Sequence, residues 1–522
     1  MAYKVTHSTF DYIIIGAGTA GCVLAARLSQ DPTTRVLLLE AGGAKRSAAM
    51  AEPAAWPSLI GSSVDWGDRT VPQRGLGDAV VVMPRGKVLG GSSAINGMMH
   101  LRGDRASYDA WEQAGAAGWN YDELLPYLKR SEQAVSADPA YRGHNGPMRV
   151  GPLPVTSKVF DALYAAALEV GHRENTDVNG AHSDGVGWTE VNVVDGERQC
   201  AADAYLGMAA SRSNLAITPD AHVMRLVLDG QRCQGVDYVV GGQHQTAQAE
   251  GEVILCAGAI GSPQLLMLSG IGPRHHLESL GIEVAAELPG VGANLVDHPL
   301  ATVTYTAKQP VRAPQYARMP QVQMPSEPGG PIDLQFLFPD APMYPRFVLG
   351  PEDGYSVVFS VVTPASRGTV RLASPDPFVA PLVDPNYFDD ERRDLRRMIT
   401  ALRLARELGA ATPLAEFRER ELFPGEQVQS DAELADYLRG AASTFFHVVG
   451  TCRIGSDAMA VLDDQLRVHG IEGLRVADAS VMPTMPSANT NATVLGIAER
   501  SAGLLAEDTI ASSTPQEIQG LR

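Results

Sequence analysis

The spacing of hydrophobic positions changes twice along residues 11–40, and this pattern predicts the first structural unit. An apolar run at 12–15 ends in a glycine-rich turn, an alanine- and leucine-rich stretch of helical length follows, and a second apolar run at 36–39 closes at Glu40. Short apolar runs bounded by turn residues are typical of strands that are buried on both faces. The pattern therefore predicts a strand–helix–strand unit at the start of the chain.

The rest of the chain mixes helical and strand periods. Strands that alternate at period two, with Gly and Asp between them, fill residues 215–256 and predict hairpins. Residues 307–331 are rich in Pro, Gln and Met and lack a period, so we expect a mobile loop of the kind that covers active sites. Helical patterns lie at 108–133, 160–171 and 391–410, and further strand patterns lie at 333–338 and 355–364.

Length and charge narrow the class of protein. A chain of 522 residues with 45% hydrophobic residues can bury a large core and is expected to form two packed domains. A net charge of −18 with no basic run argues against nucleic acid or an anionic membrane as partner. No apolar stretch approaches eighteen residues and no signal-like start is present, so we expect a cytoplasmic protein without a membrane span. The five scattered cysteines predict neither disulfides nor a metal site.

The glycine turn of the first unit carries candidate chemistry. Gly16, Gly18 and Gly21 form G-x-G-x-x-G between the first strand and its helix, and Glu40 ends the next strand. The glycines allow a tight turn and a close approach of backbone to a pyrophosphate, while the acid can accept hydrogen bonds from ribose hydroxyls. The unit predicts dinucleotide binding, and by itself it does not distinguish FAD from NAD.

Four further segments carry a family resemblance. RGKVLGGSSAIN at 85–96, GAIGSPQLLMLSGIG at 258–272, FHVVGTCRIG at 446–455 and the run from LRVADAS to GIAER at 474–500 follow one another in the chain. Together they resemble the signature segments of the glucose-methanol-choline (GMC) oxidoreductases, over essentially the whole length. Bacterial choline dehydrogenase-like enzymes and aryl-alcohol or hydroxymethylfurfural oxidases are the most similar members.

The resemblance implies an α/β (α+β) fold with two interleaved domains. A Rossmann-like FAD-binding domain would be assembled from discontinuous segments, and a substrate domain with a mostly antiparallel sheet would cover one face of the flavin. We assign 1–155, 213–300 and 441–522 to the FAD-binding domain, the last with the catalytic motif, and 156–212 and 301–440 to the substrate domain.

The resemblance also implies a set of cofactor contacts. Val223 would meet the adenine through its backbone, and Asp478 and Ala479 would hold the middle of the cofactor. Some members attach FAD to a histidine where this chain has Ile95, so we predict non-covalent FAD. His100 replaces an aromatic residue, and its role, at the surface or behind the site, stays open. The glycine-rich segment would contribute Gly90, Gly91, Ser92, Ser93 and Asn96 to the flavin and phosphates.

Two residues are candidates for catalysis. His447 lies in an apolar run that should keep its ring neutral, and it matches the catalytic histidine of the family. Asn489 matches a position that holds histidine or asparagine, and its amide could donate to the substrate oxygen. In the same Asn-Thr-Asn run, Asn491 suits a helix cap. The pocket is expected to comprise Phe445, Phe446, Val358, Ser360 and parts of 307–331.

The expected reaction is oxidation of a primary alcohol to the aldehyde. The base would remove the hydroxyl proton while hydride passes to flavin N5, and electrons would go to O2 or to a quinone-type acceptor. Two phenylalanines beside the base favour a flat or apolar alcohol, and the resemblance to aryl-alcohol and hydroxymethylfurfural oxidases implies an aromatic or furanic one. The alternatives are an acceptor-linked choline-type or other alcohol dehydrogenase, a flavin photodecarboxylase and a non-catalytic flavin-binding protein. His298, His469 and Cys256 are interpreted as structural.

Overall fold

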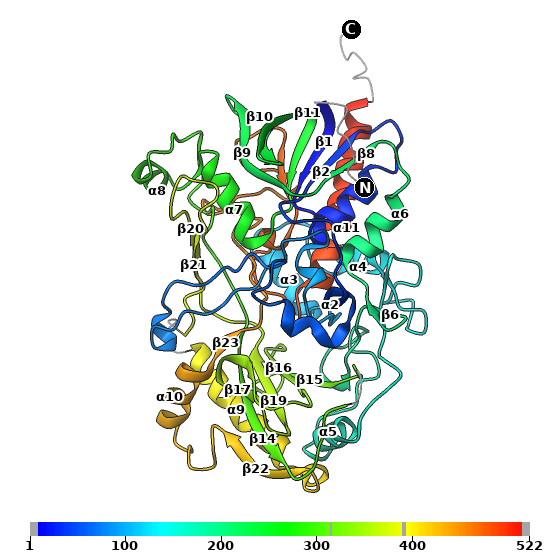
Figure 1. Cartoon of the computed structure of the whole chain (residues 1–522), viewed down its shortest axis with the longest axis vertical. Coiled ribbons are helices and arrows are strands. Elements are labelled where there is room, and N and C mark those ends of the chain that lie inside the picture. Colours follow the sequence, from blue (N-terminus) through cyan, green and yellow to red (C-terminus); the bar gives the residue numbers. More distant parts are fainter. Residues whose placement is uncertain (1–8, 314–315, 389–392, 514–522) are drawn as a thin grey trace, which may run out of the picture.

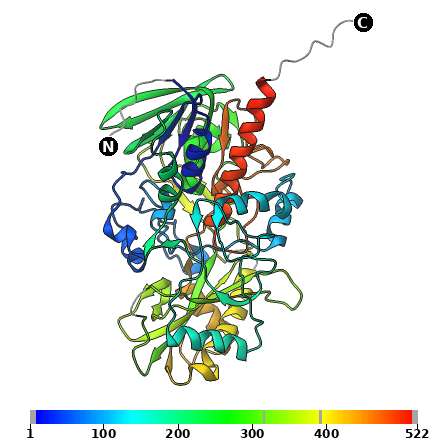
Figure 2. The same cartoon turned by 90° about the vertical axis from the view of Figure 1, so that its right-hand side faces the viewer.

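Two sheets, stacked along the longest axis of the molecule, organise the chain (Figure 1). The structure is a computed structural model that describes residues 9–313, 316–388 and 393–513. Figure 2 shows the first sheet in the upper half beside the C-terminal helix, and the second sheet in the lower half among helices. The α/β fold with a second, antiparallel part is confirmed.

The first sheet has the order β8-β2-β1-β11-β10-β9, with β24 beside β11. The pairs between β8, β2, β1, β11 and β24 are parallel, whereas β9, β10 and β11 form antiparallel hairpins. The strand–helix–strand prediction is confirmed, and the hairpin prediction is confirmed except for residues 215–218, which form the parallel strand β8. The strands are β1 (Thr9–Ile15), β2 (Val36–Leu39), β8 (Leu215–Thr218), β9 (Ala221–Asp229), β10 (Arg232–Val240), β11 (Gln243–Leu255) and β24 (Leu474–Val476).

Helices α1 (Thr19–Leu28) and α11 (Asn491–Ser513) pack against one another beside this sheet. Seven of the ten residues of α1 are buried, which explains its weak amphipathic pattern. α4 (Tyr121–Ser131) covers α11 from the other side. The other helices of this half are α2 (Ala48–Ala51), α3 (Arg105–Gln113), α6 (Gly207–Ala209), α7 (Gly258–Leu268) and α8 (Arg274–Ser279).

The second sheet is antiparallel throughout and has the order β22-β14-β19-β16-β15-β5, with β23 beside β14. Helices α5 (Lys158–Glu169), α9 (Arg393–Ala410) and α10 (Asp431–Ala441) pack in the same half and share a hydrophobic core with its strands. The strands are β5 (Gly185–Trp188), β14 (Pro299–Ala307), β15 (Pro320–Met324), β16 (Leu334–Leu337), β19 (Gly354–Val361), β22 (Arg418–Phe423) and β23 (Ser443–Thr444).

The interpretation of 307–331 as a loop is wrong for part of its length. Residues 320–324 form β15, which is hydrogen-bonded on both sides, to β5 and β16. Its polar residues Gln321 and Gln323 are 1% and 0% exposed. The sequence P-Q-V-Q-M therefore forms a buried strand, although glutamine side chains normally face water. Residues 314–315 lie outside the described residues.

Smaller elements lie outside the two large sheets. Five two-stranded pairs are β3 (Glu132–Gln133) with β4 (Met148–Arg149), β6 (Val193–Val194) with β7 (Glu197–Arg198), β12 (Ile271–Gly272) with β13 (Ala286–Glu287), β17 (Met343–Tyr344) with β18 (Val348–Leu349), and β20 (Thr369–Arg371) with β21 (Leu382–Asp384).

All five cysteines are buried and free. Among the described residues, no helix combines the length and the apolar character that crossing a bilayer requires.

The turn before α1 supplies a test of the fold. A β-carbon at Gly21 would collide with the carbonyl oxygen of Gly16, which is backbone and cannot move aside. We therefore expect Gly21→Ala to destabilise the protein by about 1–3 kcal/mol or more and to reduce its flavin content. The matched control is Gly207→Ala, at an exposed helical glycine with nothing within 4 Å of an added β-carbon. Melting temperature and flavin absorbance measure both; equal behaviour of the two variants would refute the packing argument.

Candidate active site

One cavity of about 1360 Å³ extends from the strand ends of the first sheet to the wall of the second. Gly16 and Glu40 line it at the end of β1 and β2, Leu337 and Val358 line it from β16 and β19, and His447 lies between these groups. Ligands of open parallel sheets bind at the carboxyl ends of the strands, and this cavity begins there.

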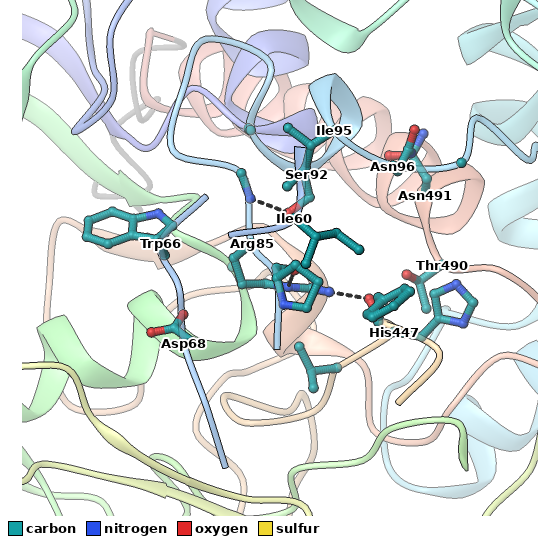
Figure 3. Close-up of a pocket in the computed structure, with 18 of the residues that line it drawn as sticks. Ile60, Trp66, Asp68, Arg85, Ser92, Ile95, Asn96, His447, Thr490 and Asn491 are labelled. Carbon is teal, nitrogen blue, oxygen red and sulfur yellow. Dashed lines mark hydrogen bonds between the residues drawn. The ribbon is translucent and has the colours of Figure 1, made fainter. Parts of the chain in front are cut away.

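The segment that carries His447 is held from two sides. Buried Asp297 accepts the His447 backbone N–H at 2.8 Å and the Thr444 hydroxyl at 2.5 Å. Arg85 reaches across the cavity wall and donates to the carbonyl of Phe446, with Trp66 and Asp68 on its other side (Figure 3). These bonds hold Phe446 at a φ of 66°, an unusual value for a residue with a side chain.

A second histidine determines which nitrogen of His447 carries the proton. His298 Nε2 lies 3.0 Å from the carbonyl of Val362, which can only accept, so His298 must donate there. Its Nδ1 is then an acceptor in the neutral ring and lies 2.9 Å from His447 Nδ1. His447 therefore carries its proton on Nδ1, and its lone pair lies on Nε2.

Burial keeps both rings neutral. Desolvation lowers the pKa of His298 to about 3. Desolvation, followed by His298 and the cationic Arg85, lowers the pKa of His447 well below its usual range. A neutral ring with its lone pair on Nε2 can accept a proton from a bound hydroxyl, and the sequence expectation of a neutral ring agrees with this direction.

Asn489 lies next to that lone pair. Its Nδ2 is 3.2 Å from His447 Nε2, although the two residues are 42 positions apart in the chain. The amide has a second N–H, so the site offers one acceptor and one donor side by side. Such a pair can take the proton of a hydroxyl and stabilise the negative charge that develops on its oxygen.

Most of the residues expected to hold a cofactor line this cavity. They are Gly16, Gly18, Glu40, Gly91, Ser92, Asn96, Val223, Asp478 and Ala479. Three others lie behind the wall instead. Gly21 packs on the turn, Gly90 adopts a φ of 95° against Cys200, and the Ser93 hydroxyl donates to the Gly90 carbonyl at 2.6 Å. Their contacts support the shape of the wall.

Two of the expected site residues also make contacts within the protein. The Asp478 carboxylate accepts bonds from the N–H of Gly258 at 2.8 Å and the hydroxyl of Ser262 at 2.5 Å, so it joins the start of α7 to the turn after β24. Asn491 begins α11, and no capping bond of its side chain is present among the described residues. It accepts the Thr19 hydroxyl at 2.8 Å and faces the cavity.

The expected substrate wall is largely present. Phe445, Phe446 and Val358 line the cavity, whereas Ser360 is fully buried behind it. Met319, which also lines the cavity, belongs to the expected segment 307–331. Sequence reasoning missed several other lining residues, which are Met99, Leu337, Phe347 and Arg85. No local pattern in the chain connects them.

His100 belongs to an internal ionic cluster. It is 1% exposed, so the surface interpretation is wrong, and its Nε2 lies 3.1 Å from Glu132. Glu132 also pairs with Arg142 at 2.8 Å, and Arg142 with Glu190 at 2.6 Å. The cluster ties the start of β3 to the segment after β5, behind the cavity wall that Met99 forms.

Comparison with known proteins decides the family. Residues 10–300 and 364–498 match two family models, both described as GMC oxidoreductase. The chain belongs to the GMC oxidoreductase family. It is therefore an FAD-dependent enzyme that acts on CH–OH donors, as the sequence resemblance implied.

Known relatives of this GMC oxidoreductase cover almost its whole length. Mitochondrial choline dehydrogenase of Homo sapiens is 39% identical over 95% of this chain and 89% of its own. The alcohol dehydrogenase (acceptor) of Pseudomonas putida is 36% identical over 95% of both chains. The crystal structure of pyridoxine 4-oxidase from Mesorbium loti superimposes with a TM-score of 0.91 at 35% identity, over 95% of this chain and 99% of the other.

The cavity fits FAD in its chemistry. α1 begins at Gly18 without a side-chain cap, so its first N–H groups are available for a diphosphate. Burial raises the pKa of Glu40 to about 7, and its carboxylate accepts the N–H groups of Ala17 and Gly42 at the cavity edge, where ribose hydroxyls could add two more donors. The buried Asn491 Nδ2 has no partner among the described residues and can donate to the cofactor. Ile95 offers no atom for a covalent bond, in keeping with non-covalent FAD.

The link between the histidines generates a mutational prediction. His298→Leu removes the acceptor of the His447 Nδ1 proton, which favours the tautomer with hydrogen on Nε2 and so blocks the lone pair. We expect alcohol oxidation to fall about 100-fold or more in kcat/KM. His298→Gln can still accept through its amide oxygen and should recover part of the loss. The same loss in both variants, at unchanged flavin content, would show that the hydrogen-bond direction is irrelevant.

Proposed function

We propose that this GMC oxidoreductase oxidises a neutral, flat primary alcohol, aromatic or furanic, to the aldehyde, with His447 as the base and Asn489 as the donor to the reacting oxygen. The observation that carries the proposal is the acceptor nitrogen Nε2 of His447, which the Asn489 amide contacts at 3.2 Å, beside an apolar wall that includes Phe445. A bound hydroxyl would take over this acceptor and receive an N–H of Asn489 on its oxygen. Bound FAD supplies the hydride acceptor.

The two residues have complementary tasks. His447 Nε2 takes the hydroxyl proton, and the imidazolium that forms keeps its Nδ1–H bond to His298 at 2.9 Å, which strengthens as the donor becomes charged. Asn489 Nδ2 donates to the oxygen while that oxygen carries negative charge. Arg85 and Asp297 hold the histidine segment so that the ring does not have to reorganise.

The wall beside His447 favours an apolar ring. Leu337, Val358 and Phe445 form a buried cluster with Leu300, and the partly buried Met99, Met319 and Phe347 pack on it. The Phe445 ring lies 4.6 Å from that of His447, centroid to centroid. A planar aromatic or furanic alcohol can bury its ring against such a surface with its hydroxyl toward the base. The pyridoxine 4-oxidase relative acts on an aromatic alcohol by its name.

A quaternary ammonium substrate such as choline fits less well. The cavity is lined by four carboxylates among the described residues: Glu40, Asp68, Asp340 and Asp478. Glu40 and Asp478 hold backbone N–H groups of the nucleotide-binding half, Asp340 accepts the Ala313 N–H at 2.5 Å, and Asp68 faces the charge of Arg85. None of them is hydrogen-bonded or ion-paired to His447 among the described residues, and the cluster around Phe445 is apolar, so we expect a neutral ring to be preferred over a cation there.

The second candidate function differs only in the electron acceptor. The relatives include acceptor-linked alcohol and choline dehydrogenases as well as an oxidase. Either O2 or a quinone-type acceptor is compatible with the same alcohol half-reaction. Location of the protein in the cytoplasm is a separate prediction from the sequence.

The direction of the His447 pKa shift predicts the pH profile. The base must be neutral to accept a proton, so activity is present above its pKa and is lost as the pH falls through it. Because burial lowers this pKa, kcat/KM should stay level as the pH falls through roughly 6.5, the ordinary histidine value, and decline only below it. Steady-state measurements of kcat/KM between about pH 4.5 and 8.5, a range that extends to both sides of the ordinary histidine pKa, test this prediction. A midpoint at or above the ordinary value would contradict a desolvated neutral base.

Flavin bleaching by a panel of alcohols tests the reaction and the substrate class. The yellow protein is mixed without oxygen with benzyl alcohol, 5-hydroxymethylfurfural, pyridoxine and choline. We expect fast bleaching by the aromatic and furanic alcohols, slow or no bleaching by choline, and bleaching slowed about 100-fold or more in His447→Ala. His276→Ala is the matched control, since that ring only accepts the Leu372 N–H. Faster bleaching by choline would refute the substrate class.

Admission of air then separates the two acceptors. Rapid recolouring with formation of hydrogen peroxide identifies an oxidase, whereas flavin that stays bleached until a quinone is added identifies a dehydrogenase.

A further inference from the structure

A row of buried polar side chains lies directly behind Asn489. Gln323 on β15, Gln335 on β16 and Ser360 on β19 are opposite one another in the sheet register. Gln335 and Ser360 are 1% and 0% exposed, and neither lines the cavity. Burying a row of polar side chains in the centre of a sheet costs free energy unless the side chains are hydrogen-bonded.

Gln335 connects this row to the site. Its Nε2 donates to Asn489 Oδ1 at 3.3 Å and to Gln321 Oε1 at 3.2 Å. Both protons of the Gln335 amide nitrogen are therefore used, one on each neighbour. Asn489 is thus held at both ends, by Gln335 at its oxygen and by His447 at its nitrogen.

The two contacts allow only one orientation of the Asn489 amide. If the amide were turned over, its nitrogen would meet the Gln335 nitrogen, and its oxygen would meet the lone pair of His447 Nε2. Each would be a contact of like groups at about the present 3.2 to 3.3 Å in a buried site. Gln335 is fixed in the same way, because turning it over would bring its oxygen against the oxygens of Gln321 and Asn489.

We infer that Gln335, which is also hydrogen-bonded to Gln321, is a positioning residue that keeps the N–H side of Asn489 turned toward the reacting alcohol oxygen. The inference rests on the proposed role of Asn489 as donor. Gln335 does not touch the substrate cavity and acts through Asn489 alone. A donor is required at this position, since only a donor selects the oxygen of Asn489.

Gln335→Met tests the bond at nearly constant shape. We expect kcat to fall at least tenfold, with KM changed by less than about threefold, because the donor acts on charge that develops only during the reaction. In the Asn489→Ala background the same substitution should change kcat by less than about twofold, since the residue through which it acts is gone. Flavin content and melting temperature are measured for each variant.

Gln335→Glu adds a signature that a merely structural role would not produce. A protonated carboxyl can still donate to Asn489 Oδ1, whereas an ionised one can only accept and would turn the amide over. We expect kcat of this variant to decrease as the pH rises through the pKa of the new carboxyl. This limb runs opposite to the acid limb of the His447 base, so the two are distinguishable.

Gln323→Met is the matched control. Gln323 is equally buried and lies opposite Gln335, but it donates to the Ser487 carbonyl at 2.9 Å and not to Asn489. Any loss that it causes should be the same with and without Asn489→Ala.

The outcomes separate the inference from the proposed function. Loss in Gln335→Met that vanishes in the Asn489→Ala background supports the inference. Equal loss in both backgrounds, or no loss in either, overturns it while leaving the function intact. An Asn489→Ala variant that keeps full kcat overturns the donor role itself, and with it the inference.

Discussion

A backbone carbonyl can only accept a hydrogen bond, and this property of Val362 determines the proton positions at the whole site. The Val362 carbonyl fixes the tautomer of His298, and His298 in turn fixes the tautomer of His447. As a result, the lone pair of His447 lies on Nε2. Because the rings are neutral, no charge has to be buried to create this base. At the other end, the row of amides fixes the direction of Asn489. The site therefore consists of one acceptor and one donor whose directions are set from opposite sides.

The surrounding scaffold explains how such directions are maintained. Asp297 is a buried carboxylate whose pKa is raised by desolvation, yet three partners share it: the Thr444 and Tyr387 hydroxyls and the His447 N–H. Arg85 supplies the nearby positive charge and holds the Phe446 carbonyl. Removing one member of such a network would leave the others unpaired in a medium of low polarity. The network thus resists the small displacements that would separate His447 from Asn489.

The two sheets line different parts of the cavity. The first sheet turns its parallel strand ends, the start of α1 and Glu40 toward the cavity, and the second sheet lines it with Leu337 and Val358. The two sheets lie one above the other in Figure 1. His447 and Asn489 come from the last segment of the chain. Under the proposed function, we expect changes at Leu337 and Val358 to alter substrate preference without disturbing the nucleotide half.

The sequence by itself determined the parts of this protein that depend on a few consecutive residues. The strand–turn–helix with Gly16 and Gly18, the hairpins of β9 to β11 and the apolar run around His447 are local patterns, and the family segments place His447 and Asn489 by resemblance. Only the tertiary structure decided what depends on contacts across the chain. His298 and His447 are 149 positions apart, and Gln335 and Asn489 are 154 apart. Gln321 and Gln323 looked like loop residues because solvent is the usual partner of an amide; here another amide and a backbone carbonyl replace it. Hydrogen-bond direction depends on which groups packing brings together, and no period or composition records that.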